Sequence, residues 1–134
     1  MKLIDIKIDI KESNEIDSNE WKNIIDLINL FPSNVKRSHE LEYYINKLNH
    51  SPYGDSYIVR ALNEENRCLG LLTFTANCIM YDKKIDKAFE MGDAFVHKKL
   101  EGRMLFSKMM KKGLEFISNK YSKSVVYATP NKKS

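Results

Sequence analysis

The stretch FVHKKLEGRMLFSKMM, residues 95–110, decides the fold of this chain. It predicts the end of a strand, a short basic loop that contains Gly102, and the start of a helix with one apolar face. Proteins often hold phosphates at such a joint, because the first amides of a helix are unpaired and carry partial positive charge. Glu101 and Met104 oppose that use, since one adds negative charge and the other adds bulk.

Length and composition indicate one folded domain. The chain has 134 residues, of which 43% are hydrophobic and 30% charged, which is typical of a globular protein. It contains no apolar run near the roughly 20 residues of a membrane span, and its N-terminus lacks the apolar stretch of a signal peptide. We therefore expect a cytoplasmic protein with no membrane partner. Cys68 and Cys78 are expected to be free buried thiols, since they lie too far apart on one strand for a disulfide.

Positive charge is concentrated at the C-terminal end. Residues 97–134 contain ten Lys and Arg against two acidic residues, whereas the remainder contains twelve against sixteen. Such a field favours a polyanion, which could be a nucleic acid, a membrane surface or a nucleotide cofactor. The alternative is a surface helix coated with lysines.

Periodicity predicts eight elements in the order β-α-α-β-β-β-α-β. Strands are expected at residues 2–10, 56–62, 68–81, 85–96 and 124–128, with a bend near Gly70 and an interruption at Gly92. Helices are expected after the N-caps Ser18 and Ser38 and over residues 102–119. This gives one α+β domain over residues 1–134, with a helical part (1–55) and a part of meander and β-α-β unit (56–134). Its sheet is mixed and mainly antiparallel, and the last two strands are parallel neighbours.

This order, with the glycine loop after the fourth strand, resembles the GNAT superfamily of acyl-CoA-dependent N-acyltransferases. The resemblance is concentrated in residues 92–134. One branch, often encoded with polysaccharide-biosynthesis genes, has approximately V-H-P-x-Y-R-G-K-G-I-F-S-K-L at this joint. The matching positions are Val96, His97, Gly102, Leu105, Phe106, Ser107, Lys108 and Met109, followed by Pro130-Asn131 after the last strand. The resemblance implies a three-layer α/β/α fold.

It also implies that acetyl-CoA, or another acyl-CoA, is the cofactor. Backbone amides of the loop would hold the pyrophosphate, and the fourth and fifth strands would splay apart to admit the thioester. The implied cofactor-binding residues are Phe95, Val96, Lys99, Gly102, Arg103, Met104, Leu105, Phe106 and Asn131.

In such enzymes an amine attacks the thioester directly, and a carboxylate on the fourth strand takes its proton. Glu90 and Asp93 are the candidates, although each could instead be a surface carboxylate. They are three positions apart, so in a regular strand they face opposite sides and at most one faces the cleft. Tyr53 is the candidate for acceptor binding. The other aromatic residues before the sheet are expected in the core, and His97 is expected to be structural; these aromatics are Trp21, Tyr43, Tyr44 and Tyr57.

Two features depart from the resemblance. The family pattern has Arg or Gln at the position of Glu101, glycine at that of Met104, and glycine or alanine at that of Phe106. Phe106 is usual in the branch named above. Repulsion between Glu101 and a pyrophosphate is about 1–4 kcal/mol before salt screening. The second departure is the end of the chain, which lacks the usual C-terminal helix and two strands. We therefore expect a fragment, or a homodimer or second chain that covers the edge of the fifth strand.

Three functions follow. The leading hypothesis is an acetyl-CoA-dependent N-acyltransferase acting on an amine of a small molecule or sugar nucleotide. The alternative is a non-catalytic, truncated GNAT-like module that binds a partner protein or a CoA-type ligand. The third, a nucleic-acid-binding module, depends on the basic tail alone, and the chain has no basic surface motif interleaved with aromatics.

Overall fold

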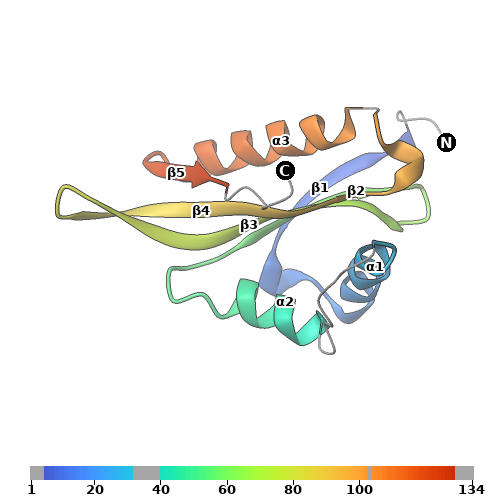
Figure 1. The fold of residues 1–134 in the computed structure, drawn as a ribbon, viewed down its shortest axis with the longest axis horizontal. Coiled ribbons are helices and arrows are strands. Elements are labelled where there is room, and N and C mark those ends of the chain that lie inside the picture. The colour runs from blue at the N-terminus through green and yellow to red at the C-terminus, as the bar shows by residue number, and fades with distance from the viewer. Residues whose placement is uncertain (1–4, 32–39, 103, 129–134) are drawn as a thin grey trace.

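We analysed a computed structural model, which describes residues 5–31, 40–102 and 104–128. The order of its strands and α-helices is the predicted β-α-α-β-β-β-α-β (Figure 1). The elements are β1 (Lys7–Glu12), the 3-10 turn η2 (Ser13–Glu15), α1 (Ser18–Ile28), α2 (Glu40–Asn49), β2 (Tyr57–Leu62), β3 (Cys68–Tyr81), β4 (Lys84–Val96), the 3-10 turn η3 (Lys98–Leu100), α3 (Leu105–Lys120) and β5 (Ser124–Tyr127).

The five strands form one sheet in the order β1-β2-β3-β4-β5. Neighbours are antiparallel except β4 and β5, which are parallel as the β-α-β unit predicts. Helix α3 covers one face of the sheet, and α1 and α2 cover the other (Figure 1). This confirms the predicted three-layer α+β fold. None of the helices in the described ranges has the length and apolar character needed to cross a membrane.

The N-terminal elements differ from the prediction in detail. The first strand begins at Lys7 and continues to Glu12 instead of ending at Ile10. Helix α1 is capped by Asp17 rather than Ser18, because the Asp17 carboxylate accepts from the Glu20 amide at 2.8 Å and Glu20 accepts from the Asp17 amide at 3.1 Å. This reciprocal capping box holds the first turn of the helix. Ser38 lies outside the described residues.

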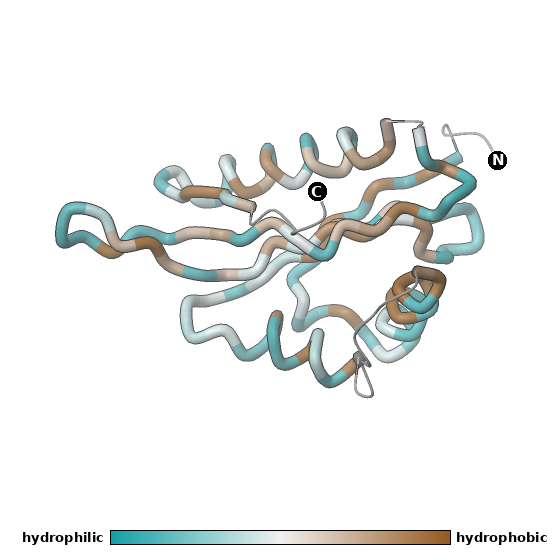
Figure 2. The backbone as a smooth tube through the Cα atoms, in the orientation of Figure 1, coloured by the Kyte–Doolittle hydropathy of each residue, from teal (hydrophilic) through white to brown (hydrophobic). Residues whose placement is uncertain are grey.

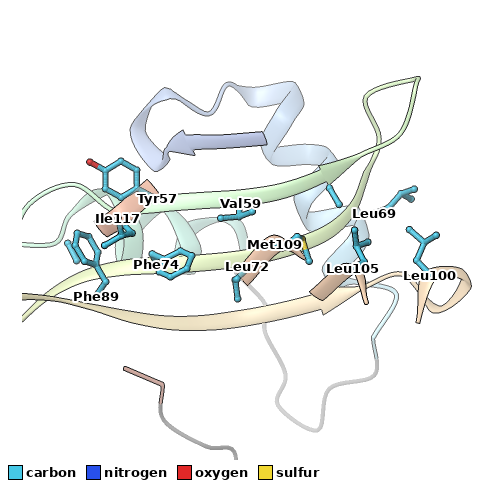
Figure 3. Packing of buried hydrophobic residues seen from close by; sticks show 12 residues of the cluster. Tyr57, Val59, Leu69, Leu72, Phe74, Phe89, Leu100, Leu105, Met109 and Ile117 are labelled. Carbon is cyan, nitrogen blue, oxygen red and sulfur yellow. The ribbon is translucent and has the colours of Figure 1, made fainter. Parts of the chain in front are cut away.

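Apolar residues pack on both faces of the sheet. The cluster between the sheet and α3 joins residues such as Phe74, Phe89 and Met109, each with 0% exposure (Figure 3). Gly113 brings α3 close to the sheet, since a Cβ there would overlap the Phe74 ring. The second cluster joins α1 and α2 to the other face, around Ile58 and other buried residues. We call these two sides the α3 face and the α1/α2 face.

Aromatic residues are distributed between these cores and the surface. Trp21, Tyr44 and Tyr57 are buried, as predicted. Tyr43 is 52% exposed, so its predicted core position is wrong. It lies beside Tyr44 on α2, and successive residues of a helix cannot face the same core.

Candidate functional site

The β4–α3 joint forms a cleft at the end of the sheet. Strand β4 ends at Val96, and His97 then caps the short turn η3 by accepting from the Lys99 amide at 3.2 Å. Gly102 follows with φ 77°, in the left-handed region where glycine is favoured. The cleft has a volume of about 370 Å³ and is lined by Val96, Leu100, Glu101, Gly102, Met104, Leu105 and Phe106.

The start of α3 presents unpaired amides to this cleft. The first helical bond runs from the Lys108 amide to the Met104 carbonyl at 3.1 Å, so the amides of residues 105–107 have no partner within the helix. Met104 is the N-cap and gives no side-chain cap. A Cβ built on Gly102 would meet nothing within 4 Å, so the approach is open on that side. These amides can therefore receive an anion.

Met104 and Glu101 weaken this anion site. Met104 has φ 60° and ψ 19°, a left-handed conformation that glycine adopts without strain and a side chain with Cβ does not. Its side chain is 71% exposed and lines the cleft. Glu101 is also exposed and lines the same cleft. The backbone thus keeps the geometry of a glycine at residue 104, while the two side chains add bulk and negative charge.

A β-bulge interrupts β4 one residue after the predicted interruption at Gly92. Thr73 pairs with Gly92 and Leu71 with Phe95, so Asp93 and Ala94 together oppose a single residue of β3. Asp93 takes φ 49°, which aspartate tolerates better than most residues. The bulge changes which side the following residues face, so the strand does not alternate regularly here.

The bulge brings both candidate carboxylates to the α1/α2 face. Glu90 pairs with Thr75, which is on the same face of β3 as Thr73, and Asp93 accepts from the Thr73 hydroxyl at 2.8 Å. The expectation that Glu90 and Asp93 face opposite sides is therefore wrong. It assumed a regular strand, and the positive φ at Asp93 turns its carboxylate back toward Thr73.

The two carboxylates have different surroundings. Asp93 accepts from the Lys47 ammonium of α2 at 2.7 Å in addition to the Thr73 hydroxyl. Glu90 is half-buried and pairs in register with Tyr127 of β5. The Tyr127 hydroxyl accepts from the Asn77 side chain at 2.6 Å. Of the two, Glu90 lies beside the last paired residues of β4 and β5.

The pairing of β4 with β5 ends beside these residues. It starts at Lys87 with Ser124 and ends at Glu90 with Tyr127. Among the described residues, no strand pairs with the outer edge of β4 from Met91 to Val96. That edge leads directly into the loop cleft, because Val96 belongs to both.

The remaining residues that were predicted to bind the cofactor lie in different parts of the structure. Val96 packs against the core of the α3 face, and Leu105 is buried in it. The Phe95 ring packs on the α1/α2 face, 5.1 Å from the Phe31 ring. Lys99 lines a second depression of about 400 Å³ that it shares with His97 and residues of α1. Arg103 and Asn131 lie outside the described residues.

Tyr53 is not brought to the candidate carboxylates. Its loop wraps the edge of β3, where Ser51 donates to the Ala76 carbonyl at 2.8 Å. The Cys78 side chain raises the pKa of the Tyr53 phenol, and the Lys87 ammonium donates to the Tyr53 carbonyl at 3.1 Å. Cys78 and Lys87 continue the α3 face of the ribbon, opposite Glu90. An acceptor site near Glu90 therefore does not include Tyr53.

Sequence reasoning missed the polar residues around the bulge, which are Lys47, Thr73, Asn77 and Tyr127. Lys47 is one of many lysines, and no local pattern marks it as a partner of Asp93. The position of Tyr127 beside Glu90 follows from the parallel register of β4 and β5, which the β-α-β order predicts without its exact alignment. Both cysteines are free, as predicted, and burial raises the pKa of Cys68 to about 11. Cys78 is only half-buried, so its predicted burial is wrong, because it lies on the part of β3 that extends past β2.

Comparison with known proteins identifies the fold. No protein-family model and no curated protein matches the sequence. Solved structures do match. An aminoglycoside acetyltransferase from an uncultured soil metagenomic sample is 19% identical, with a TM-score of 0.66 over 98% of this chain and 81% of that one. A GNAT family acetyltransferase of Staphylococcus aureus is 14% identical, with a TM-score of 0.65 over 94% and 88%.

A transcriptional regulator of Bacillus halodurans has a TM-score of 0.67 at 11% identity, over 95% of this chain and 84% of that one. The chain therefore has the GNAT fold. At these identities the likeness shows the fold alone, and the chemistry must be argued from the residues of the site.

Proposed function

We propose that this GNAT-fold protein is an acetyl-CoA-dependent N-acyltransferase that acylates an amine of a small molecule or sugar nucleotide. One observation carries the proposal: the outer edge of β4 from Met91 to Val96, with which no described strand pairs, leads into the amide-lined cleft at the start of α3. A long ligand with a phosphate group at one end and a thioester at the other matches that path. The GNAT fold of the chain supports the same class of ligand.

The residues of the joint fit an acyl-CoA. Gly102 leaves open space, and the amides of residues 105–107 supply donors for a pyrophosphate. The main chain of Phe95 and Val96 would pair with the amides of the pantetheine arm. A bound acyl-CoA supplies an activated acyl group. Glu101 and Met104 weaken binding of the pyrophosphate. We therefore expect a higher dissociation constant for acetyl-CoA than with Arg and Gly at these two positions.

Glu90 is the proposed base. It lies where the pairing of β4 with β5 ends, and an amine bound there would be within reach of its carboxylate or of one intervening water. The amine must lose a proton as its nitrogen bonds to the acyl carbon and the carbon–sulfur bond breaks. Glu90 would take that proton. The Asp93–Lys47 pair and the Thr73 hydroxyl would hold the bulge in place.

The proposal also includes a location and partners. Free cysteines suit a reducing compartment, and acyl-CoA is available in the cytoplasm, so we propose a cytoplasmic enzyme. A homodimer or second chain that pairs with the β5 edge stays a prediction. Tyr43, which is exposed on α2 and has the Lys47 ammonium 5.9 Å from its ring centre, is a better acceptor-side candidate than Tyr53.

Release of free thiol from acetyl-CoA tests the proposal. The assay would use a panel of amino sugars, polyamines and aminoglycosides, with desulfo-CoA as a non-reactive competitor. We expect amine-dependent thiol release, and a thermal shift with acetyl-CoA alone. A thermal shift without turnover on any amine would favour the non-catalytic CoA-binding module. Absence of both at millimolar acetyl-CoA would contradict the proposed function.

A further inference from the structure

The second depression, which Lys99 lines, is a candidate for another binding site. It has a volume of about 400 Å³ and is lined by residues of α1, of the turn that joins β2 to β3, and of the loop after β4. Helix α1 lies under the end of the sheet where β4 leads into η3 (Figure 1). We call this site the η3/α1 depression; its charged and titratable lining residues are Asp26, Arg67, His97 and Lys99. Leu100 lines both the depression and the β4–α3 cleft, so the two share η3 as a wall.

Leucines give the depression an apolar floor. Leu27, Leu69 and Leu100 line it and are buried. Leu30, which follows α1, also lines it and is 57% exposed. Figure 2 shows the β2–β3 turn as hydrophilic and α1 as a mixture of apolar and polar residues. A concave site with an apolar floor and a few polar groups at its rim is the usual form of a small-molecule site.

Two neutral side chains that line the depression are held so that each has a donor to spare. The His97 Nδ1 atom accepts from the Lys99 amide at 3.2 Å, so the proton of the neutral ring is on Nε2. The Asn63 side-chain oxygen accepts from the amides of Glu65 and Arg67 at 2.9 Å each, which leaves its NH₂ group as a donor. The acceptors of both side chains are thus used within the protein, and their donors remain for a ligand.

Charged residues of the depression come from three elements and are not paired. Arg67 belongs to the β2–β3 turn, Lys99 to η3 and Asp26 to α1. None of the three forms an ion pair with another residue in the part of the chain that the structure describes. Glu64 and Glu65 precede Arg67 in the same turn, but they are exposed and do not line the depression. The depression therefore offers two cations and two neutral donors against one carboxylate.

This set of groups matches a phosphate monoester. A phosphate monoester has three acceptor oxygens and close to two negative charges at neutral pH, so it can use both cations and both neutral donors. A carboxylate has two oxygens and one charge, and it would leave part of the donor set without a partner. An amine would be repelled by Arg67 and Lys99. The leucines at the floor favour a ligand that also has an apolar part.

We propose that the η3/α1 depression binds a small phosphate monoester that is separate from the acyl-CoA. The phosphate contacts Arg67, Lys99 and the free donors of His97 and Asn63, and the apolar part of the ligand covers the leucines. Asp26 accepts a hydrogen bond from a hydroxyl group of the ligand. Since η3 is also a wall of the β4–α3 cleft, the ligand lies where it can act on that cleft as an effector. Binding itself does not depend on the proposed acyltransferase activity.

Amide NMR of the full chain with phenyl phosphate tests this proposal. Phenyl phosphate combines a phosphate monoester with a small apolar group, whereas inorganic phosphate and phenol each lack one of the two. We expect phenyl phosphate to shift the amides of residues 63–69 and 97–100 in a saturable way. It should bind about tenfold or more tightly than inorganic phosphate, because its ring leaves water. Phenol should cause no saturable shift at the same concentrations.

Arg67→Met should weaken binding of phenyl phosphate about tenfold, since it removes a charged donor. The matched control is Lys22→Met, which removes an exposed cation of α1 that does not line the depression and should bind like the wild type. Thermal melts check that both variants fold. Equal binding by the Arg67→Met protein and the wild type would overturn the proposal, and so would an absence of shifts at millimolar phenyl phosphate. Shifts confined to residues 105–107, or displacement of phenyl phosphate by acetyl-CoA, would assign the phosphate to the cofactor cleft and overturn a separate site.

Discussion

The two faces of the sheet differ in the kind of residue that they bury. The α3 face is closed by an apolar and aromatic cluster, in which Phe74, Phe89 and Met109 have no exposed surface. The α1/α2 face also has an apolar core, but polar groups are set into it. Arg60 is 4% exposed and paired with Asp9 and Glu20, and Thr73 is 1% exposed beside Asp93.

On the proposed function, the α3 face maintains the fold and the α1/α2 face carries the groups that take part in the reaction. The α3 face fixes β4 and the start of α3, so it determines where the loop amides point. The α1/α2 face carries Glu90, Asp93 and Lys47 around the bulge, close to the end of the β4–β5 pairing. We therefore expect substitutions on the α3 face to change the free energy of unfolding, and substitutions near the bulge to change turnover. The predictions below are ordered from the largest expected effect to the smallest.

Phe74→Ala should lower the free energy of unfolding by about 3–5 kcal/mol, because it leaves a cavity under α3. Chemical denaturation measures this loss. The affinity of the remaining folded protein for acetyl-CoA should stay within about twofold of wild type. Leu114→Ala, at a 36% exposed position of the same helix, is the control and should have a small effect. A Phe74→Ala protein that is folded but binds no acetyl-CoA would contradict the assignment of stability to the α3 face and of the reaction to the α1/α2 face.

Glu90→Gln should reduce kcat by about 100-fold, equivalent to about 2.7 kcal/mol, because the amide cannot accept the amine proton. Stability and acetyl-CoA affinity should be nearly unchanged. Thiol-release kinetics at saturating acetyl-CoA would measure the loss. Wild-type turnover in this variant would exclude Glu90 as the base.

Lys47→Met should lower the free energy of unfolding by about 1 kcal/mol, since the Lys47–Asp93 pair is partly exposed and screened. The more informative readout is amide exchange at residues 92–95, which should become faster if the pair holds the bulge. Lys22→Met, which removes a lysine from α1 without touching the bulge, serves as the reference. Exchange at the bulge that is identical in the two variants would show that other contacts hold it.

Glu20→Gln should alter the acid sensitivity of the α1/α2 face. Burial raises the pKa of Glu20, but hydrogen bonds from Asp17 and Lys11 and the charges of Arg60 and Lys11 outweigh it, so the pKa lies below its ordinary value of 4.5. Ionised Glu20 therefore stabilises the fold above about pH 4.5, and this contribution is lost as pH falls through the lower folded-state pKa. Urea midpoints measured from neutral to acidic pH should fall less steeply for Glu20→Gln. Parallel curves for the two proteins would rule out this linkage.

The fold was largely predictable because its signals are local. A run of β-forming residues predicted the bounds of β3, and the change to a helical period located α3 after Gly102. The parallel neighbours β4 and β5 followed from the single helix between them. The cap of α1 was displaced by one residue because Asp17 and Ser18 are both good caps, and only the reciprocal bond with Glu20 distinguishes them.

The site was less predictable because it depends on a bulge and on long-range contacts. An interruption was expected at Gly92, but the positive φ falls on Asp93, and that shift turns its carboxylate to the face of Glu90. Tyr53 lies in a Pro/Gly loop whose path around β3 is determined by distant partners, Ala76 and Lys87. No periodicity in the sequence encodes such contacts.

Calorimetric titration with acetyl-CoA tests the central claim, that the β4–α3 cleft is the acyl-CoA site. The wild type would be compared with the double variant Glu101→Arg, Met104→Gly, and with Glu115→Arg as a control for the same charge change on the outer surface of α3. We predict measurable binding by the wild type and about tenfold or tighter binding by the double variant, because repulsion and bulk at the pyrophosphate are removed. Glu115→Arg should match the wild type. No heat of binding for the wild type, together with no gain in the double variant, would contradict the account.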